Sequence, residues 1–360
     1  MNNEINNMAI IKFSKRLDSI SAEIITKIAK IDELKGRWIT GAKLSPQVLG
    51  RLKRSVLITS TGASTRIEGS NLSDEDVEKV MRGLSIQKFA DRDKQEVRGY
   101  YELLQNIFDS WESIRFSEST IKHFHKELLK YSDKDQGHFG NYKFGENKVV
   151  AYDNEGKEIG VVFNPTSPHL TPKEMMELAE STNFLLKEKK YHPLLVIANF
   201  LVEFLKIHPF QDGNGRLSRV LTNLLLLKNG YLYMPYISHE KIVEDNKSDY
   251  YITLRRGQKT LGSKKEDISP WLDFFLDILL KQSRLAIDLL SEANIEKLLS
   301  ENQLAILNYI NESKETTTGE IVSHTGILRP TVKQSLEVLL KFKKIERIGL
   351  GRSTRYKIIT

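Results

Sequence analysis

The stretch that decides the fold is "IHPFQDGNGRLSR", residues 207–219, which lies between two long apolar segments. Gly213 and Gly215 let the backbone turn sharply, and a helix that begins near Arg216 directs unpaired N–H groups and the positive end of its dipole into that turn. Arg216 and Arg219 are three residues apart, so both can point from one helix face toward the same anion. The pattern predicts a phosphate-binding turn between two helices.

Two further side chains of this stretch indicate chemistry. Asp212 would repel a bound anion on its own, so its position favours a carboxylate that holds a divalent cation, Mg²⁺ by preference, against phosphates. His208 has an ordinary pKa of about 6.5 and can accept a proton from an incoming hydroxyl at pH 7. The alternative is structural, because Gly-Asn-Gly between helices is often only a turn and a lone histidine is more often structural than catalytic.

The composition is that of an ordinary globular protein. At 360 residues the chain is long enough for two or three domains. It contains no cysteine, which excludes disulfides, thiolate catalysis and Cys-based zinc sites. The start does not match a secretory signal, and the most apolar stretches, 194–207 and 271–280, are too short or too polar to span a bilayer. We expect a cytoplasmic protein with no membrane partner.

The remaining pattern predicts a mainly α fold with two exceptions. Proline and glycine are sparse inside long apolar-periodic segments, which is typical of helices. Residues 148–163 contain two β-rich runs around Asp-Asn-Glu-Gly, which predicts a hairpin that covers another part of the protein.

The C-terminal segment predicts a winged helix. Three helical segments, the second opened by a capping-box pattern at Thr317 and Glu320, precede two short β runs. From Ser300 onward the chain has ten Lys and Arg against six Asp and Glu. This local excess permits contact with DNA without requiring it, and a module that dimerises or docks a target is the alternative.

The turn resembles the motif HxFx(D/E)GNGRxxR of the Fic (filamentation induced by cAMP) family, and the match is complete. The resemblance extends to the N-terminal helical region, the hairpin, a Tyr-Tyr pair at 250 and 251 and the winged helix. It implies a helical Fic fold with a β-hairpin flap in three parts: an N-terminal helical region with an inhibitory helix at 1–92, a catalytic core at 93–290 and a winged-helix domain at 295–360.

The resemblance also implies an activity, namely transfer of AMP from ATP to a Tyr, Thr or Ser hydroxyl of a target protein or of the protein itself. His208 would then be the general base and Asp212 would hold Mg²⁺ or Mn²⁺. A homodimer is implied as well. The implied nucleotide contacts are the amides of Gly213, Asn214 and Gly215, the guanidinium groups of Arg216 and Arg219, and Tyr250, Tyr251 and Gln258 at the adenine end, while Val149 and Val150 would belong to the flap.

Two departures from the family pattern leave the identity of the nucleotide open. Many relatives have an arginine where "GHFG" places Gly140, and an asparagine often stands where this chain has Gln258. Relatives that transfer phosphate have a lysine at the first glycine of the turn, so Gly213 argues against that reaction.

An inhibitory motif is also expected upstream. "STRIEG", residues 64–69, resembles the family pattern (S/T)xxxE(G/N) through Ser64, Glu68 and Gly69. Ser64 and Glu68 share a helix face, so the carboxylate can pair with Arg219 and occupy the place of the ATP γ-phosphate. We expect Glu68→Gly to raise transfer, and Glu68 to position a water that removes AMP from modified targets. The alternative is that Glu68 is only a surface charge before a helix end.

A function of a different class competes with the enzyme. The winged helix would then be the working part of a DNA-binding regulator and the Fic core a sensor, with residues 329–335 in the major groove. No metal pair is expected at His123 and His125, since residues two apart on a helix point to different sides.

Overall fold

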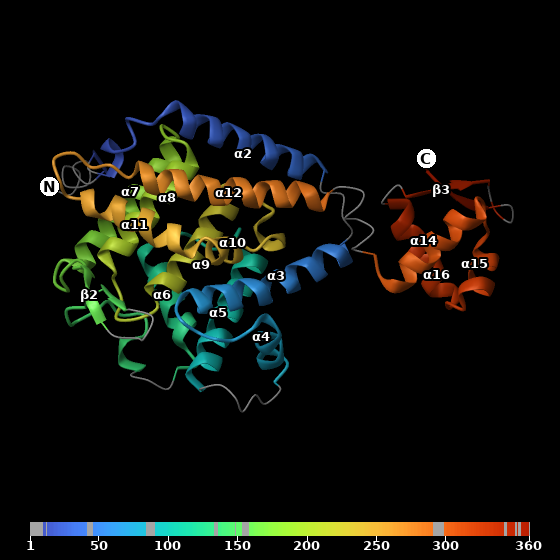
Figure 1. Ribbon diagram of the computed structural model, residues 1–360, viewed down its shortest axis with the longest axis horizontal. Coiled ribbons are helices and arrows are strands. Elements are labelled where there is room, and N and C mark those ends of the chain that lie inside the picture. Colours follow the sequence, from blue (N-terminus) through green and yellow to red (C-terminus); the bar gives the residue numbers. More distant parts are fainter. Residues whose placement is uncertain are drawn as a thin grey trace. The chain divides into compact units, whose positions relative to one another are not determined.

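The computed structural model describes residues 10–11, 13–41, 46–83, 91–132, 136–147, 149–152, 158–290, 299–341, 344–349, 351 and 354–359. Within them the chain is mainly helical, with two separate two-stranded antiparallel hairpins (Figure 1). The predicted fold class is therefore confirmed. The predicted hairpin tip, residues 153–157, lies outside the described part of the chain.

The chain divides into two compact units, residues 1–35 with 55–283 and residues 36–54 with 284–360. The boundaries expected near residues 92 and 290 stay predictions. Before residue 290 the elements are α2 (Ala22–Gly41), α3 (Pro46–Ile67), α4 (Asp74–Met81), α5 (Asp91–Ser110), α6 (Glu118–Leu129), η1 (Gln136–His138), β1 (Val149–Tyr152), β2 (Glu158–Phe163), α7 (Thr171–Glu188), α8 (Pro193–Ile207), α9 (Asn214–Lys228), η2 (Met234–Tyr236), α10 (His239–Asp245), α11 (Lys247–Thr260) and α12 (Ser269–Leu289).

The C-terminal elements form the winged helix. They are α14 (Glu301–Ser313), α15 (Thr318–Thr325), α16 (Arg329–Lys341), β3 (Ile345–Ile348) and β4 (Arg355–Ile358). The capping box predicted at Thr317 is present, since the Thr317 side chain accepts from the Glu320 N–H and the Glu320 carboxylate accepts from the Thr317 N–H. Ile306, Ile310, Ile321, Val332 and Leu339 are fully buried and form the core of this unit.

The interior of the larger unit is built on α8 and α9. Every residue of α8 from Leu194 to Leu205 is buried, and so is almost all of α9. A helix that is apolar all round belongs inside a protein, and here α7 and α9 pack on α8 while α5 and α6 pack on α9. The turn that joins α8 to α9 is thus fixed at both ends by core packing.

The C-terminal half of α3 buries small and hydroxyl-bearing side chains between the apolar Leu57 and Ile67. Ser60, Thr61, Ala63, Ser64 and Thr65 are at most 1% exposed. Ser60 Oγ donates a hydrogen bond of 2.8 Å to Ser238 Oγ at the start of α10. The helix ends before Gly69, whose φ of +100° favours glycine.

Arg66 fastens this end of α3 to its surroundings. Its guanidinium group donates to both carboxylate oxygens of Glu244 on α10, at 2.6 and 3.1 Å. It also donates to Asp74 Oδ1 on α4 and to the Leu72 carbonyl, each at 2.9 Å.

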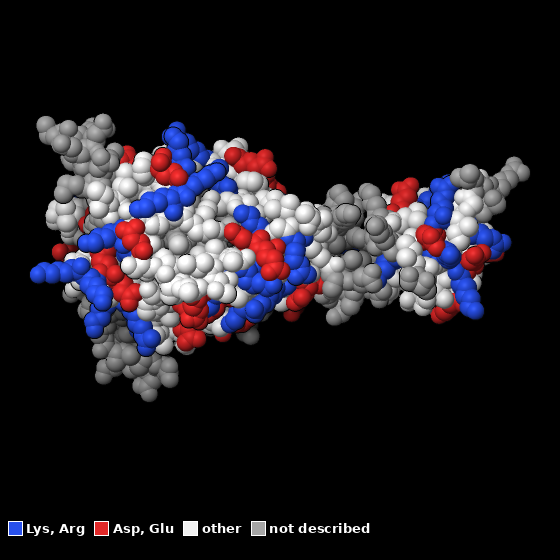
Figure 2. Space-filling view, turned by 90° about the horizontal axis from the view of Figure 1, so that it is seen from above, with Lys and Arg blue, Asp and Glu red and all other residues white. Residues whose placement is uncertain are grey.

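Acidic and basic side chains are interspersed on the face seen in Figure 2. The net charge of +7 is therefore not gathered in one patch on that face. Among the described residues, no helix is long and apolar enough to cross a membrane.

Candidate active site

The turn between α8 and α9 begins and ends with left-handed backbone. His208 caps the C-terminus of α8 with φ 51° and ψ 61°, and Gly213 precedes α9 with φ 76°. Glycine adopts such angles freely, whereas a residue with a Cβ does so at a cost. The backbone of His208 is therefore strained, which is common at functional positions.

Hydrogen bonds within the turn and a ring contact with α6 hold the turn in shape. Asn214 closes it from inside: its Oδ1 accepts from the Phe210 N–H at 3.0 Å and its Nδ2 donates to the Phe210 carbonyl at 2.8 Å. The fully buried Phe210 ring stacks on His125 of α6, with ring centroids 3.9 Å apart.

His125 in turn fixes the backbone next to Asp212. The Gly140 N–H donates to His125 Nδ1 at 2.9 Å, so the proton lies on Nε2, which donates to the Asp212 carbonyl at 3.1 Å. Burial lowers the pKa of His125 to about 4, in agreement with this neutral form. Gly140, which stands where many relatives have arginine, has φ +77°, and a Cβ there would lie 3.1 Å from the Lys122 carbonyl oxygen. Its backbone serves the turn, and a larger residue would be strained.

The Asp212 carboxylate lies at the edge of the turn and is about half exposed. Its Oδ1 accepts from the Gly213 N–H at 2.5 Å and lies 3.3 Å from Arg216 Nη2. Burial acts to raise the pKa of Asp212, but the charge of Arg216 and the Gly213 N–H outweigh it and keep that pKa below its usual value. Arg216 Nη1 also lies 2.8 Å from Glu96 Oε2 of α5.

The described residues contain no group of three or more His, Cys, Asp or Glu side chains that could enclose a metal ion. A cation at Asp212 would need water and phosphate oxygens to complete its shell. Mg²⁺ binds in this way, through one or two carboxylates together with substrate phosphates, so the residues present fit it.

Arg219 lies at the other end of the turn and is held by α3. Its Nε donates to Ser64 Oγ at 2.8 Å, and its Nη2 donates to the Ser64 carbonyl at 2.9 Å and to Glu68 Oε1 at 2.7 Å. The expected pairing of Glu68 with Arg219 is thus present. Nη1 of Arg219 is buried and has no hydrogen-bond partner among the described residues, so one donor remains for an anionic ligand.

Glu68 also touches the glycine turn itself. A Cβ added to Gly215 would overlap Glu68 Oε1. The carboxylate therefore lies against the N-terminal turn of α9, where a phosphate group would otherwise approach the free N–H groups.

His208 is neutral at physiological pH. Burial, aided by the positive charge of Lys143, lowers its pKa to about 4. Its ring centroid lies 6.3 Å from that of Phe163 at the end of β2, opposite Val149 in the hairpin register. The hairpin backbone therefore ends close to His208, whereas the side chains of Val149 and Val150 lie outside the described part.

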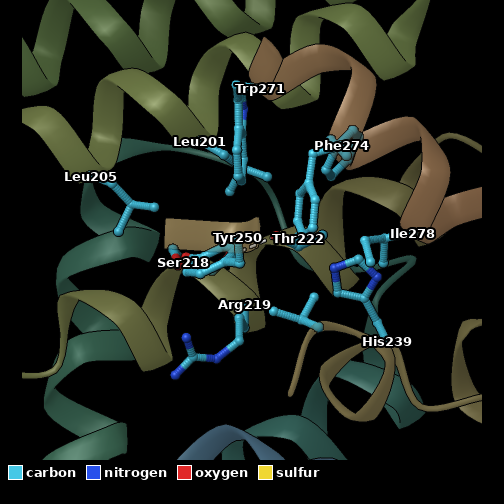
Figure 3. A pocket seen from close by; sticks show the side chains of 12 residues that line it. Leu201, Leu205, Ser218, Arg219, Thr222, His239, Tyr250, Trp271, Phe274 and Ile278 are labelled. Atoms are coloured by element: carbon cyan, nitrogen blue, oxygen red, sulfur yellow. Dashed lines mark hydrogen bonds between the residues drawn. The ribbon is translucent and has the colours of Figure 1, made fainter. Parts of the chain in front are cut away.

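The residues expected at the adenine end are only partly brought together. Tyr250 is buried and lines a small pocket with Arg219, Ser218, Trp271 and Phe274 (Figure 3). Tyr251 lies beside it and its hydroxyl donates to the Ile67 carbonyl at 3.4 Å. Gln258 is buried but does not line this pocket.

Three residues of the site were missed in the sequence. Glu96, His125 and Lys143 lie on α5, on α6 and in the segment after η1, and each contacts the turn or α9. The residues of the turn and of α9 that they contact are 64 or more positions away along the chain, so no local sequence pattern predicts these contacts.

Comparison with protein families finds two matches. Residues 115–226 match the Fic/DOC family, and residues 300–342 match the bacterial regulatory proteins of the arsR family. The first covers the turn and the second covers α14 to α16.

Curated relatives carry the same resemblance. A probable protein adenylyltransferase of Aquifex aeolicus (strain VF5) is 27% identical over 189 residues, 51% of this chain and 52% of the relative. A Fido domain-containing protein of Dictyostelium discoideum is 40% identical over 72 residues, 20% of this chain and 50% of the relative. The chain spans about half the length of these relatives.

Solved structures share the fold. A Fic family protein from Desulfovibrio desulfuricans G20 has a TM-score of 0.64 at 24% identity, covering 95% of this chain and 97% of that one. A Fic domain-containing signaling protein from Bacteroides thetaiotaomicron VPI-5482 has a TM-score of 0.60 at 23% identity, covering 72% and 96%.

Proposed function

The chain belongs to the Fic family, and from this premise we propose that it transfers AMP from ATP to a hydroxyl group of a protein. The observation that carries the proposal is the strained α8–α9 turn, which holds the neutral imidazole of His208 beside a helix N-terminus and two buried arginines. The curated relative in Aquifex, named a probable protein adenylyltransferase, supports the same reaction.

In this proposal the chain acts by positioning and by charge. Amides of Gly213 to Gly215, with Arg216 and Arg219, hold the triphosphate. The target hydroxyl oxygen forms a bond to the α-phosphorus, the bond from that phosphorus to the bridging oxygen of the β-phosphate breaks, and pyrophosphate leaves. His208 accepts the hydroxyl proton. Asp212 would hold Mg²⁺ or Mn²⁺, which neutralises phosphate charge when bound.

We further propose that α3 inhibits the reaction. The Nε and Nη2 groups of Arg219 donate hydrogen bonds to Ser64 and Glu68. In this proposal the same groups would bind the γ-phosphate of ATP if α3 moved away. A hydrogen bond to a charged group contributes about 1.5–3 kcal/mol, so loss of the Glu68 carboxylate should tighten ATP binding by about 10- to 100-fold.

The test is transfer of radiolabel from ATP to protein. With label on the α-phosphate, Glu68→Gly and Glu68→Gln should increase labelling of the chain itself or of lysate proteins, and His208→Ala in the Glu68→Gly background should abolish it. With label on the γ-phosphate no transfer is expected, which separates AMP transfer from phosphate transfer. Equal α-labelling in all variants would exclude the proposal.

A reverse reaction, removal of AMP by a water that Glu68 positions, belongs to the same proposal. Self-labelled Glu68→Gly protein provides its substrate. Unmutated protein with Mg²⁺ or Mn²⁺ should release the AMP, whereas unlabelled Glu68→Gly protein should not. If neither protein releases AMP, the reverse reaction is ruled out.

The arsR-type match favours a second candidate function, DNA binding by the winged helix. Arg329, Lys333 and Gln334 are exposed on α16, the helix that such folds place in the major groove. A gel shift with mixed-sequence duplex DNA should weaken as salt rises, and Lys333→Ala should reduce the slope of log K against log salt by about 0.9 if it contacts a phosphate. Absence of any shift at low salt would contradict DNA binding and favour a docking or dimerising role for the winged helix. The homodimer stays a prediction.

A further inference from the structure

Lys143 is a buried lysine beside the α8–α9 turn and is 3% exposed. Its backbone N–H donates to the Pro209 carbonyl at 2.9 Å, and its Nζ donates to the Ile207 carbonyl at 3.0 Å. One residue thus binds the carbonyl groups of both chain neighbours of His208.

Asn147 completes the arrangement. Its Oδ1 accepts from Lys143 Nζ at 2.9 Å and its Nδ2 donates to the Phe210 carbonyl at 3.2 Å. The segment 143–147 therefore holds three carbonyl groups within four residues of the turn.

We propose that Lys143, supported by Asn147, is the positioning residue for His208 and keeps its left-handed backbone in place so that the imidazole faces the reacting hydroxyl. The proposal rests on the function proposed above. A residue in a sparsely populated conformation persists only where its surroundings over-determine it, and the hydrogen bonds from Lys143 and Asn147 provide this constraint. Lys143 acts through His208, because its donors go to backbone carbonyls and to Asn147.

The charge of Lys143 points to the same role. A buried ammonium group is costly, and a methionine of similar length would pack at lower cost if only volume mattered. Burial lowers the pKa of Lys143 to about 8, with Glu174 of α7 opposing, so the group is mostly charged at pH 7. Around His208, this charge favours the neutral imidazole, whereas Glu68 of α3 and Asp212 of the turn favour the protonated one.

Two readouts test the proposal. In Lys143→Met, NMR of labelled histidines should show His208 titrating at a higher pH than in the unmutated protein, with the signal assigned by its absence in His208→Ala; in the unmutated protein it should not titrate between pH 5 and pH 8. In the Glu68→Gly background the same change should lower kcat for AMP transfer by about 100-fold and leave KM for ATP within about twofold, because the turn is misplaced while the phosphate contacts on α9 remain.

Asn147→Ala separates position from charge. It removes the support to Phe210 and Lys143 but keeps the ammonium group, so kcat should fall while His208 still does not titrate between pH 5 and pH 8. This variant also decides the question if Lys143→Met does not fold. A folded Asn147→Ala with unchanged kcat would overturn the positioning role.

Lys228 provides the matched control. Its Nζ also donates to two backbone carbonyls, those of Trp111 and Glu112, and burial lowers its pKa too. Lys228→Met should change neither the His208 titration nor kcat. If a folded Lys143→Met behaves like Lys228→Met in both readouts, Lys143 has no such role. If Glu68→Gly transfers no AMP at all, the proposed function fails, and the NMR readout still decides whether Lys143 controls His208.

Discussion

His208 joins a strained backbone to an imidazole that stays neutral, and both properties have the same origin. The residue ends α8, whose interior position buries its ring and lowers its pKa to about 4. The same end of α8 is where the chain must reverse to start α9, so the left-handed φ falls on His208. An imidazole that is neutral at physiological pH thus follows from where the helix ends.

The first prediction concerns the pH dependence of transfer. A general base works in its deprotonated form, which for His208 exists above a pKa of about 4 instead of 6.5. The rate of AMP transfer by Glu68→Gly should therefore stay nearly constant from pH 7.5 down to about 5.5. Initial rates in buffers of constant ionic strength, with circular dichroism at each pH to confirm folding, test this. A half-maximal rate near pH 6.5 would contradict the environment described for His208.

The residues of the contiguous motif could be predicted from the sequence, whereas the distant residues that contact the motif could not. The Asp212, Arg216 and Arg219 side chains lie within eight residues of one another, and turn and helix geometry alone gather them around one space. Glu96, His125 and Lys143 reach the same space only because α5, α6 and the segment after η1 pack on the turn. Chain folding over 64 to 120 positions decides such contacts, and a single sequence carries no period or spacing for them.

Among the elements, α5 and α6 meet through a glycine. A Cβ at Gly99 would overlap the carbonyl oxygen of Leu128, a backbone atom that cannot move aside like the end of a flexible side chain. Gly99→Ala should therefore lower the free energy of unfolding by about 1–3 kcal/mol despite the better helix propensity of alanine. Urea denaturation measures this.

The control is Gly36→Ala on α2, where an added Cβ meets nothing within 4 Å. It should be neutral or stabilising by up to about 1 kcal/mol, since alanine favours the helix. Equal effects of the two substitutions would show that the close contact of α5 and α6 is absent in solution.

A second element-scale prediction concerns the attachment of α3. Arg66 binds α10 and α4, and it stands two residues before Glu68. Arg66→Ala should loosen the end of α3 and raise AMP transfer to a level between those of the unmutated protein and Glu68→Gly, although Glu68 is intact. Labelling with α-labelled ATP measures it. Arg82→Ala, which removes an exposed pair with Glu78 on α4, should have no effect. If Arg66→Ala has no effect either, the position of Glu68 does not depend on this anchor.

The elements themselves were largely predictable. Long apolar-periodic segments gave the helices, and the capping box at Thr317 is formed as expected. The arrangement of α3 was harder to predict from residues, because a helix that buries serine and threonine has no strong apolar stripe. Only the short motif at 64–69 indicated that its end faces the α8–α9 turn.

For the whole molecule, binding of ATP should raise the thermal stability of the folded protein. A ligand that binds only the folded state stabilises it by RT ln(1 + [L]/Kd), so a tenfold tighter Kd adds about 1.4 kcal/mol at saturation, or roughly 2–3 °C in Tm. Relative to its own Tm without nucleotide, Glu68→Gly should therefore gain that much more than the unmutated protein when ATP and Mg²⁺ are added. Thermal denaturation tests this. An equal gain in both proteins would mean that Glu68 does not compete with ATP.

The division of the molecule into units follows less directly from sequence. A change in local charge and a switch from helical to β-rich patterns marked the winged helix. The compact units, by contrast, group residues 36–54 with the C-terminal part, and that grouping depends on packing between segments that are far apart in the chain.

The serine- and threonine-lined side of α3 bears on how tightly α3 would hold the site in the proposed inhibition. Exposure of a buried leucine uncovers a large apolar surface, whereas an exposed serine or threonine hydroxyl can form hydrogen bonds with water. This end of α3 buries both kinds of side chain, with Leu57 and Ile67 on either side of the serines and threonines. Thr61 Oγ1 is buried and has no hydrogen-bond partner within the described part of the chain, so exposure to water would provide one. Release of this segment would be opposed by the contacts of Arg66, Ser64 and Glu68 and by the burial of Leu57 and Ile67. Under the proposed inhibition, the strength of these few contacts would set the basal rate of the unmutated protein.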